Sequence, residues 1–225
     1  MSYPPHVTSP SPLSSALGEL ANPEAMSAAL SRAGLSAKLS QEQATRVARF
    51  FLTRAQWSKT HNLSGPQALD VLSTDLVDAV AVASILAPDL PLSDVGSGSG
   101  VPGMLVACLE PTRAVRLVEP LAKRCAFLRT VAHKLGLSEV KVYRDKWPCA
   151  AVEALGPTQV VSRAVVSPES WPQLASGPQS AHIIQMLAHL RPEWPLEGYQ
   201  LASEVSYTVH GGGERLVRRW AKVEE

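Results

Sequence analysis

The stretch DVGSGSGVPG, residues 94–103, constrains the fold of this chain more than any other feature of its sequence. It follows a short apolar run and holds four closely spaced glycines: Gly96, Gly98, Gly100 and Gly103. Glycine loses more backbone freedom on folding than any other residue, so the cluster indicates a tight turn that another group approaches closely. A strand, a glycine-rich turn and a helix together are typical of open α/β sheets that bind a nucleotide-like ligand at the helix N-terminus.

The second half of the chain alternates short β-like runs with helical patterns. The expected strands are 92–95, 114–119, 140–143, 159–162 and 182–187, and the expected helices are 103–109 and 121–135. Residues 199–209 and 215–223 are expected to form a closing antiparallel pair. This alternation predicts an α/β fold: a Rossmann-like, mostly parallel sheet with helices on both faces.

The first half reads as helical after a tail. Residues 1–20 are rich in Pro and Ser and are expected to be mobile, 21–90 to form an N-terminal helical extension, and 91–225 to form the ligand-binding core. Asn22-Pro23-Glu24 predicts a helix start, with the helix running to Gly34. Ser40 to Gln43 resembles a capping box that opens a second helix, with the apolar stripe Ala44, Val47, Phe51 and Ala55. A loop is predicted over 57–66 and a longer helix over 70–86.

Composition narrows the class of partner. The chain has 225 residues, 45% of them apolar, and a formal net charge of +1. The segment from Arg113 to Lys146, however, contains nine basic residues and only three acidic ones. This clustering favours an anionic partner. The three cysteines lack metal-ligand or disulfide spacing, so no metal is predicted. No signal peptide or membrane span is evident, so we expect a cytoplasmic monomer that does not bind membranes.

Two cofactor classes compete for the glycine loop. Gly98 to Gly103 formally matches the GxGxxG dinucleotide fingerprint, which is weak on its own. Asp94, however, precedes the glycines, and its carboxylate would repel a pyrophosphate but attract the ammonium group of S-adenosylmethionine. Glu119 ends the second strand and is expected to bind ribose hydroxyls, which either cofactor carries. The loop therefore favours S-adenosylmethionine over a dinucleotide, and Gly96, Ser97, Gly98 and Gly100 are its expected contacts. A β-carbon at Gly98 or Gly100 is expected to enter the space that the cofactor needs.

With its following segment LVEPLAKRCAFLRTVAHKLGL, the loop resembles the bacterial 16S rRNA guanine-N7 methyltransferases, the glucose-inhibited division protein B family. Val101-Pro102-Gly103 and the pattern Glu119-x-x-x-Lys123-Arg124 carry the resemblance, as do WSKTHNLS at 57–64, Asp78 and the strand end Ser162-Arg163-Ala164. The resemblance spans roughly residues 40–190 and implies a class I methyltransferase fold. It also implies that 16S rRNA or the small ribosomal subunit is the partner.

The chain departs from the family pattern at three basic positions. Gly65-Pro66-Gln67 stands where the family has an arginine, Asp75 stands where it has a histidine, and His189 stands where it has a lysine followed by glycine. These departures leave three alternatives open. The chain could methylate another substrate on the same fold, bind cofactor or RNA without turnover, or be a dinucleotide oxidoreductase, against which Asp94 counts.

The resemblance, together with the places of these residues in the predicted fold, implies roles for further residues. Arg163 would position the substrate or bind its phosphate and is the candidate catalytic residue, and Lys123, Arg124 and His189 would contact RNA. Lys146 and Trp147 follow the third strand and would border the adenine of the cofactor. Guanine N7 is an unprotonated nucleophile at neutral pH, so methyl transfer to it requires in-line positioning rather than a general base.

Overall fold

The computed structural model describes residues 22–35, 37–61, 69–163, 165–189, 196–209, 211 and 213–223, without the side chains of 59–61 and 69–73. The predicted tail over 1–20, residues 62–67 and Ala164 lie outside the described residues.

Seven strands form one sheet in the order β3-β2-β1-β4-β5-β7-β6. The strands are β1 (Leu92–Val95), β2 (Val115–Val118), β3 (Val140–Tyr143), β4 (Thr158–Ser162), β5 (Ser180–Leu187), β6 (Tyr199–Thr208) and β7 (Glu214–Lys222). Strands β1 to β5 pair in parallel, while β7 lies antiparallel between β5 and β6. The expected strands and the closing antiparallel pair are therefore confirmed, with ends that shift by one or two residues.

Helices pack against this sheet, and the first two begin at the expected capping residues Asn22 and Ser40. They are α2 (Pro23–Arg32), α3 (Gln41–His61), α4 (Leu69–Ile85), α5 (Gly103–Leu109), α6 (Ala122–Lys134), α7 (Ala150–Glu153) and α8 (Trp171–Ala175). The Asn22 side chain accepts a hydrogen bond from the backbone N–H of Glu24 at 2.9 Å. Ser40 and Gln43 bond each other's backbone N–H groups at 3.2 and 2.8 Å, which is the predicted capping box.

The predicted loop at residues 57–66 is wrong in its first part, because α3 continues to His61. Polar residues dominate 56–61, so the local pattern suggests an end to the helix. Trp57 nevertheless packs against Phe127 of α6, with ring centroids 5.7 Å apart. Tertiary packing of this kind stabilises a helix beyond what its local sequence indicates.

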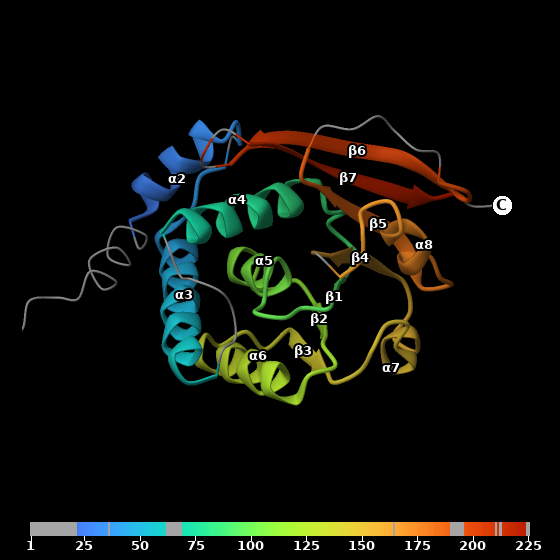
Figure 1. Ribbon diagram of the computed structural model, residues 1–225, viewed down its shortest axis with the longest axis horizontal. Coiled ribbons are helices and arrows are strands. Elements are labelled where there is room, and N and C mark those ends of the chain that lie inside the picture. The colour runs from blue at the N-terminus through green and yellow to red at the C-terminus, as the bar shows by residue number, and fades with distance from the viewer. Residues whose placement is uncertain are drawn as a thin grey trace, which may run out of the picture.

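Helices cover both faces of the sheet, as expected (Figure 1). Successive side chains of a strand point to opposite faces. Val161 accordingly joins the large apolar cluster that includes residues of α2 to α6, whereas Val160 joins a smaller cluster with Trp171 of α8. Helix α7 contributes Val152 to a third cluster, against Val118 of β2.

The chain reverses its direction of sheet building at β1. It proceeds from β1 through β2 to β3, then returns to place β4 on the other side of β1. Ligands bind open α/β sheets at such a switch point, outside the carboxyl ends of the strands. Leu187 at the end of β5 pairs with Leu216, which brings the start of β7 close to the carboxyl ends of the parallel strands. Among the described residues, no helix is long and apolar enough to cross a membrane.

Candidate functional site

The glycine loop follows β1 and divides its glycines between a cavity and the core. Gly96, Gly98 and Gly100 all have positive φ angles, of 68°, 54° and 91°. A β-carbon on Gly98 would meet only a backbone oxygen at 3.6 Å, whereas one on Gly100 would lie 2.9 Å from Met104 and 3.2 Å from Phe50. The expectation that Gly100 leaves room for a ligand is therefore wrong, because its missing side chain leaves room for core packing.

A cavity of about 680 Å³ opens beside this loop. Of the predicted site residues, it brings together Gly96, Ser97, Gly98, Glu119, Arg124, Lys146, Trp147 and Arg163. It is also lined by Val95, Ser99, Val101, Val118, Pro120, Leu121, Asp145, Val165 and Leu174. Asp94, Gly100, Lys123 and His189 do not line it.

Glu119 stands at the end of β2 with its carboxylate against the glycine loop. It is only 1% exposed and accepts hydrogen bonds from the backbone N–H groups of Gly98 and Leu121, each at 2.9 Å. Arg124 of α6 lies 3.8 Å from the same carboxylate. Each oxygen of a carboxylate can accept two hydrogen bonds, so Glu119 retains capacity for hydroxyl donors.

Asp94 lies behind the loop rather than in the cavity. The side chain is fully buried, and one carboxylate oxygen accepts a hydrogen bond from the N–H of Gly103 at 3.0 Å, where α5 begins. The other oxygen has no hydrogen-bond partner among the described residues. Burial raises the pKa of Asp94 to about 7. Asp94 thus fixes the loop to α5, and its contact with a ligand ammonium stays a prediction.

The loop after β3 forms another wall of the cavity. Trp147 is partly buried and donates its indole N–H to the carbonyl of Leu174 at 3.1 Å, which fixes the ring beside the cavity. Lys146 is exposed at the rim. Stacking of Trp147 on an adenine stays a prediction.

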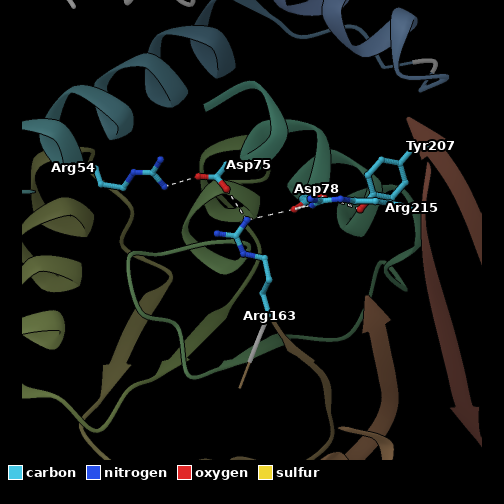
Figure 2. Close-up of polar contacts among 6 residues, drawn as sticks. All are labelled: Arg54, Asp75, Asp78, Arg163, Tyr207 and Arg215. Atoms are coloured by element: carbon cyan, nitrogen blue, oxygen red, sulfur yellow. Dashed lines mark hydrogen bonds and ion pairs between the residues drawn. The ribbon is translucent and has the colours of Figure 1, made fainter. Parts of the chain in front are cut away.

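Arg163, the predicted catalytic residue, follows β4 and reaches toward α4 (Figure 2). Its Nη1 atom lies 2.5 Å from Asp75 and 3.3 Å from Asp78, both on α4. Burial alone would lower the pKa of Arg163, but the two carboxylates more than offset this and hold the pKa above its ordinary value. The guanidinium is therefore a fixed cation at the carboxyl ends of the parallel strands.

Three further residues, which sequence reasoning did not connect with Arg163, complete this charged cluster. Arg54 of α3 donates to Asp75 at 2.7 Å, and Tyr207 of β6 donates to Asp78 at 2.8 Å. Arg215 of β7 bonds both oxygens of Asp78, at 2.8 and 2.7 Å (Figure 2). The resemblance had drawn attention to Asp78 and, as a departure from the family pattern, to Asp75, whereas the chain gives no local signal for Arg54, Tyr207 and Arg215.

A second cavity, of about 700 Å³, adjoins the first and shares Arg163 and Val165 with it. It is lined by Asp78, Ser162, Arg163, Val165, Val166, Pro168, Trp171, Met186, Leu187, Ala188, Tyr207 and Arg215. His189 and Lys123 are exposed and line neither cavity, so their expected RNA contacts stay predictions. Within the described residues, no three His, Cys, Asp or Glu side chains are grouped as metal ligands.

Solved structures share this fold. A protein from Klebsiella pneumoniae described as an O-methyltransferase aligns with a TM-score of 0.52 at 10% identity, covering 79% of this chain and 90% of that chain. At so low an identity the likeness concerns the fold alone, and it identifies the architecture as the Rossmann-like class I methyltransferase fold.

Sequence comparisons identify the family. The chain matches proteins called ribosomal RNA small subunit methyltransferase G from several bacteria. The Wolinella succinogenes protein is 33% identical over 130 residues, 58% of this chain and 66% of its own length. The Dichelobacter nodosus protein is 32% identical over 70% of this chain and 75% of its own length, and the Desulfotalea psychrophila protein is 29% identical over 76% and 86%. The family model of rRNA small subunit methyltransferase G, GidB, matches residues 43–184. Since this match covers well over half of the sequence, including the glycine loop, Glu119 and Arg163, the chain belongs to the rRNA small subunit methyltransferase G family.

Proposed function

We propose that this chain transfers the methyl group of S-adenosylmethionine to N7 of a guanine in 16S rRNA of the small ribosomal subunit. The observation that carries the proposal is the family match, which spans the glycine loop and the residues around its cavity. The substrate named for the relatives is ribosomal RNA of the small subunit. Such a substrate would place the enzyme in the cytoplasm, and we propose that it acts as a monomer.

The residues around the first cavity fit this cofactor in three ways. The cavity volume lies within the range of small-molecule sites. Open space where a Gly98 side chain would stand lets a ligand approach the backbone. Glu119 keeps acceptor capacity for two ribose hydroxyls.

The remaining residues would position the cofactor and the substrate. Asp94, through its unpartnered oxygen, would attract the ammonium group of the methionine moiety. Lys146 and Trp147 would border the adenine, and Arg124 and the exposed Lys123 would bind RNA phosphates at the rim.

When bound, the cofactor would supply an electrophilic methyl group on a sulfonium. The chain would hold guanine N7 in line with that methyl, and the N7 lone pair would form the new C–N bond as the C–S bond breaks. Because N7 carries no proton at neutral pH, no side chain has to act as a general base. Catalysis would then come from orientation and proximity, with Arg163 fixed at the junction of the two cavities.

Methyl transfer to defined subunits tests this proposal. We expect the chain to transfer radiolabelled methyl from S-adenosylmethionine to 30S subunits from a strain that lacks its own enzyme. Digestion of the product to nucleosides should yield 7-methylguanosine. A different methylated nucleoside, or label in protein alone, would reject the proposed substrate.

Cofactor choice is tested separately by calorimetric titration. We expect binding of S-adenosylhomocysteine and no binding of NAD, because the carboxylate of Asp94 lies directly behind the loop. Binding of NAD without a response to S-adenosylhomocysteine would contradict the methyltransferase proposal.

A further inference from the structure

The second cavity carries an inference beyond methyl transfer, because its polar wall is a pair of arginines held on one buried carboxylate. Asp78 is 0% exposed, and it accepts hydrogen bonds from Nη1 of Arg163 and Nη1 of Arg215. The side chains of the two arginines are 31% and 29% exposed, and both line the cavity. They come from different elements, the end of β4 and the start of β7 (Figure 2).

Each arginine uses only one nitrogen in this arrangement. Arg163 bonds Asp75 and Asp78 through Nη1, and Arg215 bonds both oxygens of Asp78 through Nη1. Among the described residues, the Nη2 and Nε atoms of Arg163 and Arg215 have no hydrogen-bond partner. These two nitrogens form the side of a guanidinium that binds two oxygens of a phosphate or carboxylate at once.

The charges of the cluster leave one positive charge uncompensated. Arg54, Arg163 and Arg215 contribute three positive charges, whereas Asp75 and Asp78 contribute two negative ones. Burial and the charge of Asp78 raise the pKa of Tyr207, so its hydroxyl stays neutral. Because three donors already bond the Asp78 carboxylate, its repulsion of an incoming anion is weakened.

Apart from Ser162 and Tyr207, the rest of the cavity wall is apolar. Val166, Trp171, Met186 and Leu187 line it beside the arginines. An anionic group joined to a ring system would suit such a wall, and a nucleotide has this composition. Because the cavity shares Arg163 and Val165 with the first one, a nucleotide there would lie next to the methyl donor.

We propose that Arg163 and Arg215 together bind a backbone phosphate of the target nucleotide in the second cavity. This inference rests on the proposed RNA substrate and adds Arg215, which lies outside the family match at residues 43–184, as a substrate-binding residue. Asp78 and Asp75 are positioning residues that hold the two guanidinium groups at the cavity wall through their Nη1 atoms.

Guanosine 5′-monophosphate and guanosine form a matched pair of probes, because they differ only in the phosphate. With S-adenosylhomocysteine at saturation, we expect the parent to bind the monophosphate at least about tenfold more tightly at low ionic strength, as charge-assisted hydrogen bonds predict. Arg215→Met and Arg163→Met should each reduce this ratio to about twofold or less.

Arg219→Met is the control. Arg219 lies four residues along the same strand, on the same face as Arg215 and about 13 Å away, and lines neither cavity. The Arg219→Met substitution removes the same charge as Arg215→Met and should leave the ratio of the two affinities unchanged. A folded Arg215→Met variant with the parental ratio would overturn the proposal, as would an equal loss in Arg219→Met.

Arg215→Lys keeps the experiment decisive if the methionine variant does not fold. Lysine can still pair with Asp78 but lacks the planar two-nitrogen side, so the ratio should fall while the melting temperature stays close to that of the parent. A parental ratio in this folded variant would reject the bidentate contact.

Arg163 also borders the first cavity, where the carboxylate of the cofactor is a competing ligand for it. A second titration therefore distinguishes a contact with the phosphate from a contact with this carboxylate. S-adenosylhomocysteine and methylthioadenosine differ by the amino-carboxyl group. We expect Arg163→Met to weaken both by the same small factor. A selective loss of S-adenosylhomocysteine binding would assign Arg163 to the cofactor and overturn its part of the pair.

Methyl transfer by the parent protein distinguishes this inference from the proposed function. If the parent methylates 30S subunits while Arg215→Met leaves both KM for the subunits and the nucleotide ratio unchanged, the proposed function holds and the phosphate site at Arg163 and Arg215 is wrong. If the ratio depends on Arg215 but the parent methylates no RNA, the proposed function is wrong and the phosphate site holds.

Discussion

At the scale of single residues, Gly98 and Gly100 have different roles although both have positive φ angles. A β-carbon on Gly98 would enter open space, so Gly98→Ala should leave a folded protein, less stable by about 1–2 kcal/mol from the positive φ alone. Its affinity for S-adenosylhomocysteine should fall at least about tenfold, because the methyl group would stand at the cavity wall. Calorimetric titration measures this loss, and unchanged affinity would show that Gly98 serves only the turn.

Gly100→Ala should show the opposite behaviour. Its β-carbon would lie 2.9 Å from Met104 and 3.3 Å from Leu128 in the core. We expect overpacking to lower the free energy of unfolding by roughly 1–3 kcal/mol, with S-adenosylhomocysteine affinity of the remaining folded protein within about threefold of the parent. Urea denaturation alongside the titration separates the two effects. A stable variant that loses the ligand would contradict this division of the loop.

Asp94 gives the stability a pH dependence of defined sign. Burial raises its pKa from 3.8 to about 7, so between these values the folded state holds a proton that the unfolded state releases. The stability from this proton is complete below about pH 4 and is lost as the pH rises through about 7. Relative to Asp94→Asn, the parent should therefore lose free energy of unfolding across this window and then level off. Urea denaturation of both proteins across the window measures the difference, and parallel profiles would show that Asp94 has an ordinary pKa.

At the scale of elements, the Arg54–Asp75 pair joins α3 to α4. Arg54 is 1% exposed, lies over the rings of Phe50 and Phe51, and bonds Asp75 at 2.7 Å. Arg54→Met should lower the free energy of unfolding by roughly 3–5 kcal/mol, because a buried carboxylate loses one of its two cations. In Arg54→Met with Asp75→Leu, most of this loss should be recovered, since Asp78 still holds Arg163. Chemical denaturation of the single and double variants tests this, and simple additivity would show that the pair is not coupled.

Local sequence was enough to predict most elements and the loop half of the site. The strands follow from short β-like runs, and Gly96, Gly98 and Glu119 follow from the turn between a strand and a helix. The end of α3 was missed because Trp57 is held by Phe127 from another helix. The charged cluster was missed because its members are far apart in the chain: 21 positions for Arg54 and Asp75, 137 for Asp78 and Arg215.

At the scale of the whole molecule, the predicted extension and the predicted core share one apolar cluster. Met26 of α2, Phe51 of α3 and Val217 of β7 all belong to it. The division at residue 90 stays a prediction, but the shared cluster argues that both parts unfold together. Scanning calorimetry should show one transition with equal calorimetric and van't Hoff enthalpies. Two separate transitions would mean that the helical extension is an independent unit.

The place of the β6–β7 hairpin has a consequence for the effect of substitutions at its tip. Because β7 runs antiparallel to β5, Tyr207 and Arg215 arrive at the carboxyl ends of the parallel strands from a segment beyond the family match. The glycine loop and Glu119 lie on the other side of the switch point and have no part in this hairpin. Substitutions at the hairpin tip would therefore change the second cavity directly, and would reach the first cavity only through Asp78 and Arg163.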